Sequence, residues 1–175
     1  MQAATALIFE GTRAADDAFD RVVRDRGVQL LRIAWRILGN RADAEDVVQD
    51  VFLRLHRHGL DFPNEAALGA WLCRVAVNRC IDRSRRARPI GELPELIAAN
   101  SSAEAAMLRE EQKRILTQAL AALPARERAA IVLREIEGLP TADVAAILGS
   151  SKSTVRSQIS KAMTKLRAIL AKEGE

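Results

Sequence analysis

Apolar residues recur at helical spacing along most of the chain. In residues 19–39 and again in residues 43–57 they return every three or four positions, as on the buried face of a helix. Gly39 and Asn40 supply a stop signal after the first of these segments. Asp43 is placed to cap the second.

The middle of the chain holds one more helix and then a break. Gly, Pro and Asn form a loop at residues 59–64, after which the apolar spacing predicts a third helix over residues 65–86. Pro89, Pro94 and the polar residues after them interrupt the pattern as far as Ser102. Because proline disfavours helix, we expect a flexible linker here.

The C-terminal part predicts further helices. One precedes Pro124, which opens the next as a first-turn proline, and Gly138 closes that helix. No segment has the alternating pattern of a strand. We therefore expect an all-α fold of two small helical domains, residues 1–88 and 103–175, joined by the linker at residues 89–102.

The segment from Thr141 to Leu170 has the layout of a helix-turn-helix. A short apolar helix, with Thr141 as its candidate cap, leads to Gly149, which permits the positive φ of a tight turn. Ser150 or Ser151 can then cap a longer basic helix with its hydroxyl. In such a motif the second helix enters the DNA major groove.

The longer helix divides into an apolar stripe and a basic outer face. The stripe, which we expect to be buried, consists of Val155, Ile159, Ala162 or Met163, Leu166 and Leu170. The outer face carries the candidate DNA contacts Lys152, Ser153, Arg156, Ser157, Ser160 and Lys161. Arg156 is the best candidate for a bidentate guanine contact, and Lys165 and Arg167 suit phosphates or solvent. The alternative is an ordinary basic surface helix.

Charge is clustered although its total is modest. The net charge is +4, from 27 basic and 23 acidic residues among 175. Basic residues gather at 74–88 and 152–172, and acidic residues gather at 43–50. A clustered basic surface indicates a polyanionic partner, with a solvated helix face as the alternative.

The acidic cluster lies on the polar face of the helix expected at residues 43–57. Asp43, Asp46, Gln49 and Asp50 share this face, which is either solvated or docks a basic protein. Acid–base catalysis needs a positioned partner or a pocket beside the carboxylates. The sequence offers neither, so we expect no catalytic residues and no enzyme.

The helix at residues 65–86 is rich in arginine. Its polar residues Arg74, Asn78, Arg79, Arg83 and Arg86 could follow a phosphate backbone. Trp71 on the same helix is either a core anchor, which we favour, or a platform on which an unstacked base rests.

Other chemistry is sparse. Cys73 and Cys80 lie two helical turns apart, about 10 Å, which is too far for a disulfide. With His56 and His58 they match no compact zinc motif, so we expect buried thiols and no metal site. No run of eighteen apolar residues predicts membrane insertion, and the N-terminal residues lack the basic region followed by an apolar stretch that is typical of a signal peptide. We expect a cytoplasmic protein.

The chain resembles a bacterial RNA polymerase sigma factor of the extracytoplasmic-function (ECF) group in three ordered segments: GNRADAEDVVQDVFLRL, AWLCRVAVNRCIDRSRR and ALPARERAAIVLREIEGLPTADVAAILGSSKSTVRS. The resemblance implies a promoter-specificity subunit without a cofactor. Its partners would be core RNA polymerase (the coiled coil of the largest subunit and the flap), promoter DNA and a separate anti-sigma factor. A monomer is implied when free, whereas the alternative is a dimeric helix-turn-helix regulator that acts alone.

The resemblance also assigns residues to roles. Polymerase docking falls to Asp43, Asp46, Gln49, Asp50 and Arg54. The loop that would hold a flipped −10 base consists of Leu60, Asp61, Phe62, Pro63 and Asn64. The DNA strand that carries the −10 element would then run along Trp71, Asn78, Arg79, Arg83 and Arg86. The six outer-face residues of the basic helix would read the −35 element. Gln158, Lys161 and Met163 depart from the family's arginine-rich pattern, which implies fewer phosphate contacts.

Overall fold

The computed structural model describes residues 2–86, 111 and 114–173. All regular structure in these ranges is helical, and the expected all-α fold is confirmed. The expected linker at residues 89–102 lies outside the described residues, as do residues 103–110, 112 and 113 of the helix expected before Pro124.

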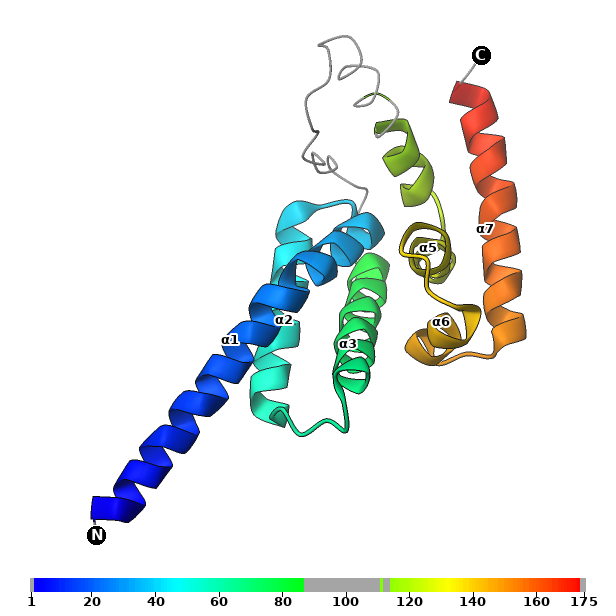
Figure 1. The fold of residues 1–175 in the computed structure, drawn as a ribbon. Helices are drawn as coiled ribbons and strands as arrows, with labels where there is room; N and C mark the ends of the chain where they lie inside the picture. The colour runs from blue at the N-terminus through cyan, green and yellow to red at the C-terminus, as the bar shows by residue number, and fades with distance from the viewer. Residues whose placement is uncertain (1, 87–110, 112–113, 174–175) are drawn as a thin grey trace, which may run out of the picture.

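Three helices form an N-terminal unit: α1 (Gln2–Leu38), α2 (Arg41–His58) and α3 (Glu65–Arg86). Each packs against the other two. The largest buried side chains between them, all at most 1% exposed, are Ile33, Ile37, Val51, Leu55, Leu72 and Val77. The N-terminal part of α1 projects beyond α2 and α3 (Figure 1).

In the N-terminal unit, two helix starts differ from the sequence expectation. α1 begins at Gln2 and not near residue 19, because the Ala-rich segment before residue 19 has a high helix propensity. The N-cap of α2 is Asn40, whose Oδ1 accepts a hydrogen bond from the Asp43 N–H at 3.1 Å. Asp43 is therefore not the cap, and it lies in the first turn, where a negative charge favours the helix dipole.

The C-terminal unit consists of a helical stretch at residues 114–121, α5 (Ala125–Ile131), the π-helix η1 (Val132–Ile136), α6 (Thr141–Leu148) and α7 (Lys152–Glu173). The single helix expected between Pro124 and Gly138 is thus α5 followed by η1. All residues from 128 to 133 are buried, because this helix packs between α7 and α3. Such a segment has no polar face.

The start of α6 corrects another expectation. Pro140 occupies the N-cap position of α6, and no side chain caps the helix there. Thr141 is the first helical residue and not the cap. The fixed φ of Pro140, −57°, sets the direction in which α6 begins.

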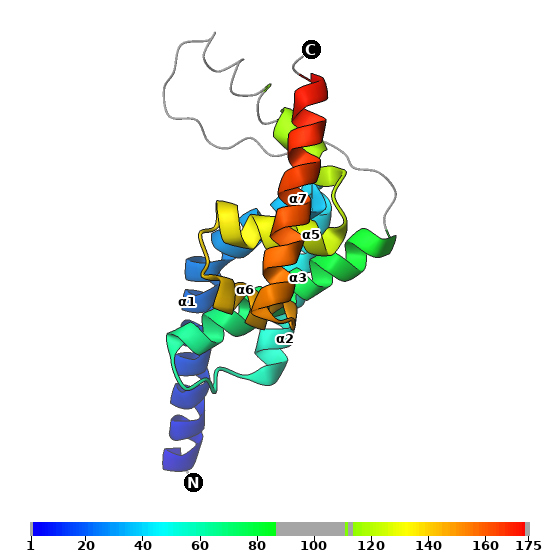
Figure 2. The same ribbon diagram turned by 90° about the vertical axis from the view of Figure 1, so that its right-hand side faces the viewer.

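The two units pack against each other through α3. This helix contacts α1 and α2 on one side and α5 and α6 on the other, and Figures 1 and 2 show it in the middle of the molecule. Arg128 of α5, 6% exposed, donates to the Ile37 carbonyl at the end of α1 at 2.7 Å. Its Nη2 donates to the carbonyls of Ala121 and Leu123 at 2.6 and 2.9 Å. Burial lowers the pKa of Arg128.

Candidate functional site

The segment α6–turn–α7 has the expected helix-turn-helix order. Gly149 adopts φ 59° and ψ 44°, in the left-handed region. Ser151 Oγ accepts a hydrogen bond from the Thr154 N–H at 3.1 Å, so Ser151 caps α7. The Ser150 Oγ is buried and finds no hydrogen-bond partner among the described residues. The turn is therefore built by a glycine and a serine cap, as predicted.

The six predicted −35 residues are exposed together on the N-terminal half of α7. They are Lys152, Ser153, Arg156, Ser157, Ser160 and Lys161. Val155 and Ala162, both 0% exposed, hold the opposite face of α7 in the core. Three of the six are cations, so this face is positively charged and suits an anionic ligand.

Farther along α7 the structure departs from the expectation. The Lys165 Nζ lies 2.8 and 3.0 Å from the two carboxylate oxygens of Glu127. Lys165 is thus engaged within the protein. Leu170 is 41% exposed, so its expected burial is wrong, and the fully buried stripe ends at Leu166.

Arg126 is a candidate functional residue that the sequence did not suggest. It lines an open hollow beside Ser153, Ser157 and Lys161, and one of its Nη atoms donates to the Leu148 carbonyl at 3.2 Å. Packing of α5 on α7 brings it there. Since that packing joins segments distant in sequence, no local pattern could have identified it.

The predicted polymerase-docking residues lie along one side of α2. Asp46, Gln49, Asp50 and Arg54 are exposed, and Asp43 is half-buried. The buried side of the same helix consists of Ala44, Val47, Val51 and Leu55. An acidic, solvent-facing stripe on a rigid helix is a surface that a basic partner can bind.

The structure brings two predicted sites together, because carboxylates of α2 pair with arginines of α3. The Arg83 Nη2 lies 2.5 Å from the Asp43 Oδ1 and 3.0 Å from the Asp46 Oδ2. The Arg79 Nη2 lies 3.3 Å from the Asp50 Oδ2. Burial acts to lower the pKa of Arg83, but its hydrogen bonds to Asp43 and Asp46 outweigh that effect and raise it. The expected docking and DNA surfaces are therefore contiguous.

The predicted −10 loop is bordered by aromatic rings. The His58 ring stacks on Phe62 with centroids 5.1 Å apart, and Trp71 lies 5.7 Å from Phe62 and 5.2 Å from His58. Trp71 is half-buried, so it is neither a fully buried anchor nor a free platform. The Asn64 Oδ1 accepts from the Ala67 N–H at 2.8 Å and holds the start of α3.

The other −10 candidates differ in accessibility. Asn78 is exposed, whereas Arg79 and Arg83 are partly buried by their ion pairs. Arg86 is the last residue of α3, and its side chain lies outside the described residues.

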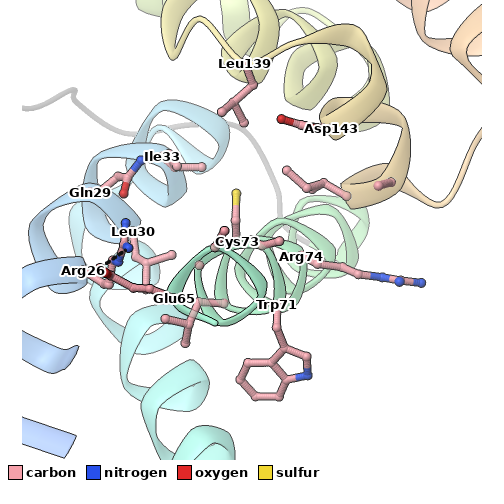
Figure 3. Close-up of a pocket in the computed structure, with 16 residues that line it drawn as sticks. Arg26, Gln29, Leu30, Ile33, Glu65, Trp71, Cys73, Arg74, Leu139 and Asp143 are labelled. Carbon is pink, nitrogen blue, oxygen red and sulfur yellow. Dashed lines mark hydrogen bonds and ion pairs between the residues drawn. The ribbon is translucent and has the colours of Figure 1, made fainter. Parts of the chain in front are cut away.

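Both cysteines are free thiols on α3. Cys80 is buried, and its burial raises its pKa. Cys73 lines a cleft of about 480 Å³ between α1, α3 and α6. Figure 3 shows its sulfur on the side of α3 that faces Leu139, with Trp71 on another side of the helix. Desolvation, and secondarily the charge of Glu137, raises the pKa of Cys73 to about 12.

Over the described ranges, the acidic, histidine and cysteine side chains form no group of three or more arranged to hold a metal ion. None of the described helices has the length and apolar character needed to cross a membrane.

Comparison with known proteins assigns a family to both units. Residues 22–90 match Sigma-70 region 2, and residues 113–166 match Sigma-70, region 4. The chain is 34% identical to the ECF RNA polymerase sigma factor SigM of Mycobacterium tuberculosis, over 87% of this chain and 77% of that protein. It is 34% identical to SigL of the same species, over 94% of this chain and 96% of that protein.

A solved structure supports the same assignment. CnrH, solved in complex with the cytosolic domain of CnrY, matches with a TM-score of 0.66 and 30% identity, over 91% of this chain and 94% of that chain. Helices, motifs and relatives therefore agree: the chain belongs to the ECF group of sigma-70 RNA polymerase sigma factors, which direct polymerase to promoters.

Proposed function

We propose that the two units of this sigma factor have different roles in promoter binding. Residues 1–88 would dock on core polymerase and open the −10 element, and residues 103–175 would read the −35 element. Residues 89–102 would join them. The observation that carries this proposal is the combination, on one chain, of an acidic helix face, an aromatic loop beside arginines, and a capped helix-turn-helix with an exposed cationic face.

The −35 reader in this proposal is α7. Arg156 stands on its exposed face, one turn beyond the Ser151 cap, where side chains of a recognition helix reach base edges. Its planar guanidinium can donate two hydrogen bonds to one guanine. Lys152, Lys161 and Arg126 would contact phosphates and set the register of the helix.

The −10 reader would be the loop at residues 60–64 together with α3. Aromatic faces near single-stranded DNA provide stacking surfaces for bases taken out of the duplex. Phe62 and Trp71 offer two such faces, and His58 extends them. Asn78 and the arginines of α3 would follow the sugar–phosphate backbone.

Asp46, Gln49 and Asp50 would dock on the coiled coil of the largest polymerase subunit, with Asp43 and Arg54 beside them, and the C-terminal unit would reach the flap. A separate anti-sigma factor is part of the proposal. Its support is that CnrH, at 30% identity, was solved with a domain of another protein bound.

The test is run-off transcription with core polymerase and this chain as the only sigma factor. We expect core-dependent initiation, and loss of core binding in the double variant Asp46→Arg/Asp50→Arg without loss of helical content. A matched control is Glu45→Arg, on the same helix outside the proposed contacts. Unchanged initiation by the double variant would refute the docking assignment. A free dimer in light scattering would favour the regulator that acts alone.

A further inference from the structure

Glu137 joins the two units through an ion pair that is almost removed from solvent. Its side chain is 4% exposed. Arg32 of α1 donates to the carboxylate through Nε at 3.2 Å and through Nη2 at 2.8 Å. Arg36, one turn later in α1, donates to the same carboxylate. Glu137 directly follows η1, so all three bonds cross from the N-terminal to the C-terminal unit.

Other contacts between the units surround this ion pair. Arg128 reaches the Ile37 carbonyl at the end of α1. The cleft in Figure 3 has α1 and α3 on one side and Leu139 and α6 on the other, with Cys73 between them. Because the thiol is half-buried at this boundary, its accessibility depends on whether the units stay together.

With its two units packed together, which we call the closed state, the chain is too small to reach the −35 and −10 elements at the same time. Elements centred near −35 and −10 are about 25 base pairs apart, which is about 85 Å at 3.4 Å per base pair. A compact body of about 150 residues has a radius of gyration of about 15 Å, or about 40 Å across. The two reading surfaces cannot engage both elements while α3 packs against α5 and α6.

We propose that Arg32, Arg36 and Glu137 form a latch that holds the free chain closed, and that the chain releases this latch when it binds a promoter. The need to open rests on the proposed function. The closed state does not, because it rests on the three side chains and on the contacts around them.

The arginines of the latch are more exposed than Glu137, so removing the arginines and removing the glutamate have different consequences. The side chains of Arg32 and Arg36 are 45% and 23% exposed, so both can be hydrated if Glu137 is removed. Glu137 has almost no exposure, so removal of both arginines leaves a desolvated carboxylate, which is strongly unfavourable. The arginine variant therefore opens more readily than the glutamate variant.

The experiment is alkylation of the full chain by N-ethylmaleimide, with the rates at Cys73 and Cys80 resolved by mass spectrometry. The variants are Glu137→Gln and Arg32→Gln/Arg36→Gln. Glu127→Gln is the matched control, since Glu127 is 14% exposed and pairs with Lys165 inside one unit. Cys80 is the internal control because it lies in the core of the N-terminal unit.

We expect Cys73 to react slowly in the wild type and in Glu127→Gln, a few times faster in Glu137→Gln, and about tenfold faster in the double arginine variant. In a molecule that stayed closed, loss of the arginines would leave the Glu137 charge unneutralised and slow Cys73 alkylation. Slower or unchanged Cys73 alkylation in the double variant would overturn the latch. A parallel rise at Cys80 would also overturn it, because that signals unfolding. Either result leaves core-dependent transcription by the wild type unaffected.

Discussion

At the scale of single residues, exposure separates the side chains that can bind DNA from those already engaged. Arg156 is exposed, whereas Lys165 on the same helix is held by Glu127 and Arg83 by Asp43 and Asp46. A cation that is already paired must exchange one anion for another to reach a phosphate. Free and paired cations should therefore respond differently to substitution.

Arg156→Ala is expected to remove a bidentate base contact and to relax base preference in the −35 element. The loss should be about 1–3 kcal/mol at one base position, measured by promoter competition with the holoenzyme. Arg167→Ala, an exposed cation outside the proposed reading face, is the control and should weaken all promoters equally. Unchanged preference in Arg156→Ala would remove this residue from the reading face.

Asp43→Asn/Asp46→Asn is expected to free Arg83 and to strengthen binding of the chain to a single-stranded oligonucleotide. The salt dependence should become steeper by about 0.7, the value for one added phosphate contact on a single strand. Fluorescence anisotropy across a salt series measures both. Asp25→Asn/Asp82→Asn removes two exposed charges from the N-terminal unit, and among the described residues neither carboxylate pairs with an arginine. An equal gain in oligonucleotide affinity in this control would show that the effect comes from the change in net charge and not from Arg83.

At the scale of elements, the turn between α6 and α7 fixes the orientation of the proposed reading helix, α7. Gly149 has φ 59°, and a Cβ built there would meet no atom within 4 Å. A side chain at this position is therefore disfavoured by the backbone conformation and not by a clash. In α1, by contrast, Gly27 lies in regular helix, where a Cβ would contact the Phe52 ring at 3.9 Å.

Substitution by alanine should change the free energy of unfolding in opposite directions at these two glycines. Gly149→Ala should lower the free energy of unfolding by about 1 kcal/mol, because an L-residue in the left-handed region is strained. Gly27→Ala should raise it by about 0.5–1 kcal/mol, because alanine favours helix. Urea denaturation of both variants measures the difference. Equal effects of the same sign would contradict the described backbone at the turn.

The helices that could be predicted from the sequence are those with an uninterrupted periodic pattern. The expected third helix at residues 65–86 coincides with α3, and the Gly149 turn with its Ser151 cap is local chemistry. The π-helix η1 was not predictable, because an i→i+5 turn differs from an α-helix in its hydrogen-bond pattern and leaves no distinct spacing of apolar residues over five positions. The cap of α2 was misassigned because Asn40 and Asp43 have equally suitable side chains.

At the scale of the whole molecule, the contacts on which the proposals rest join distant parts of the chain. Arg83 meets the α2 carboxylates across 37 and 40 positions, and Arg32 meets Glu137 across 105. No local pattern encodes such pairs, so the sequence indicated each surface but not their contact. The structure brings the proposed docking and DNA residues together in the N-terminal unit and packs that unit against the proposed reader of the −35 element.

The most direct measurement is initiation by core polymerase with this chain on a template library randomised separately at the −35 and −10 elements, with transcripts sequenced. The wild type should require preferred bases in both elements. Arg156→Ala should relax the preference at −35 alone, and Phe62→Ala should weaken it at −10 alone. Initiation without preference in either element, or an Arg156→Ala effect confined to −10, would contradict the division of promoter reading between the two units.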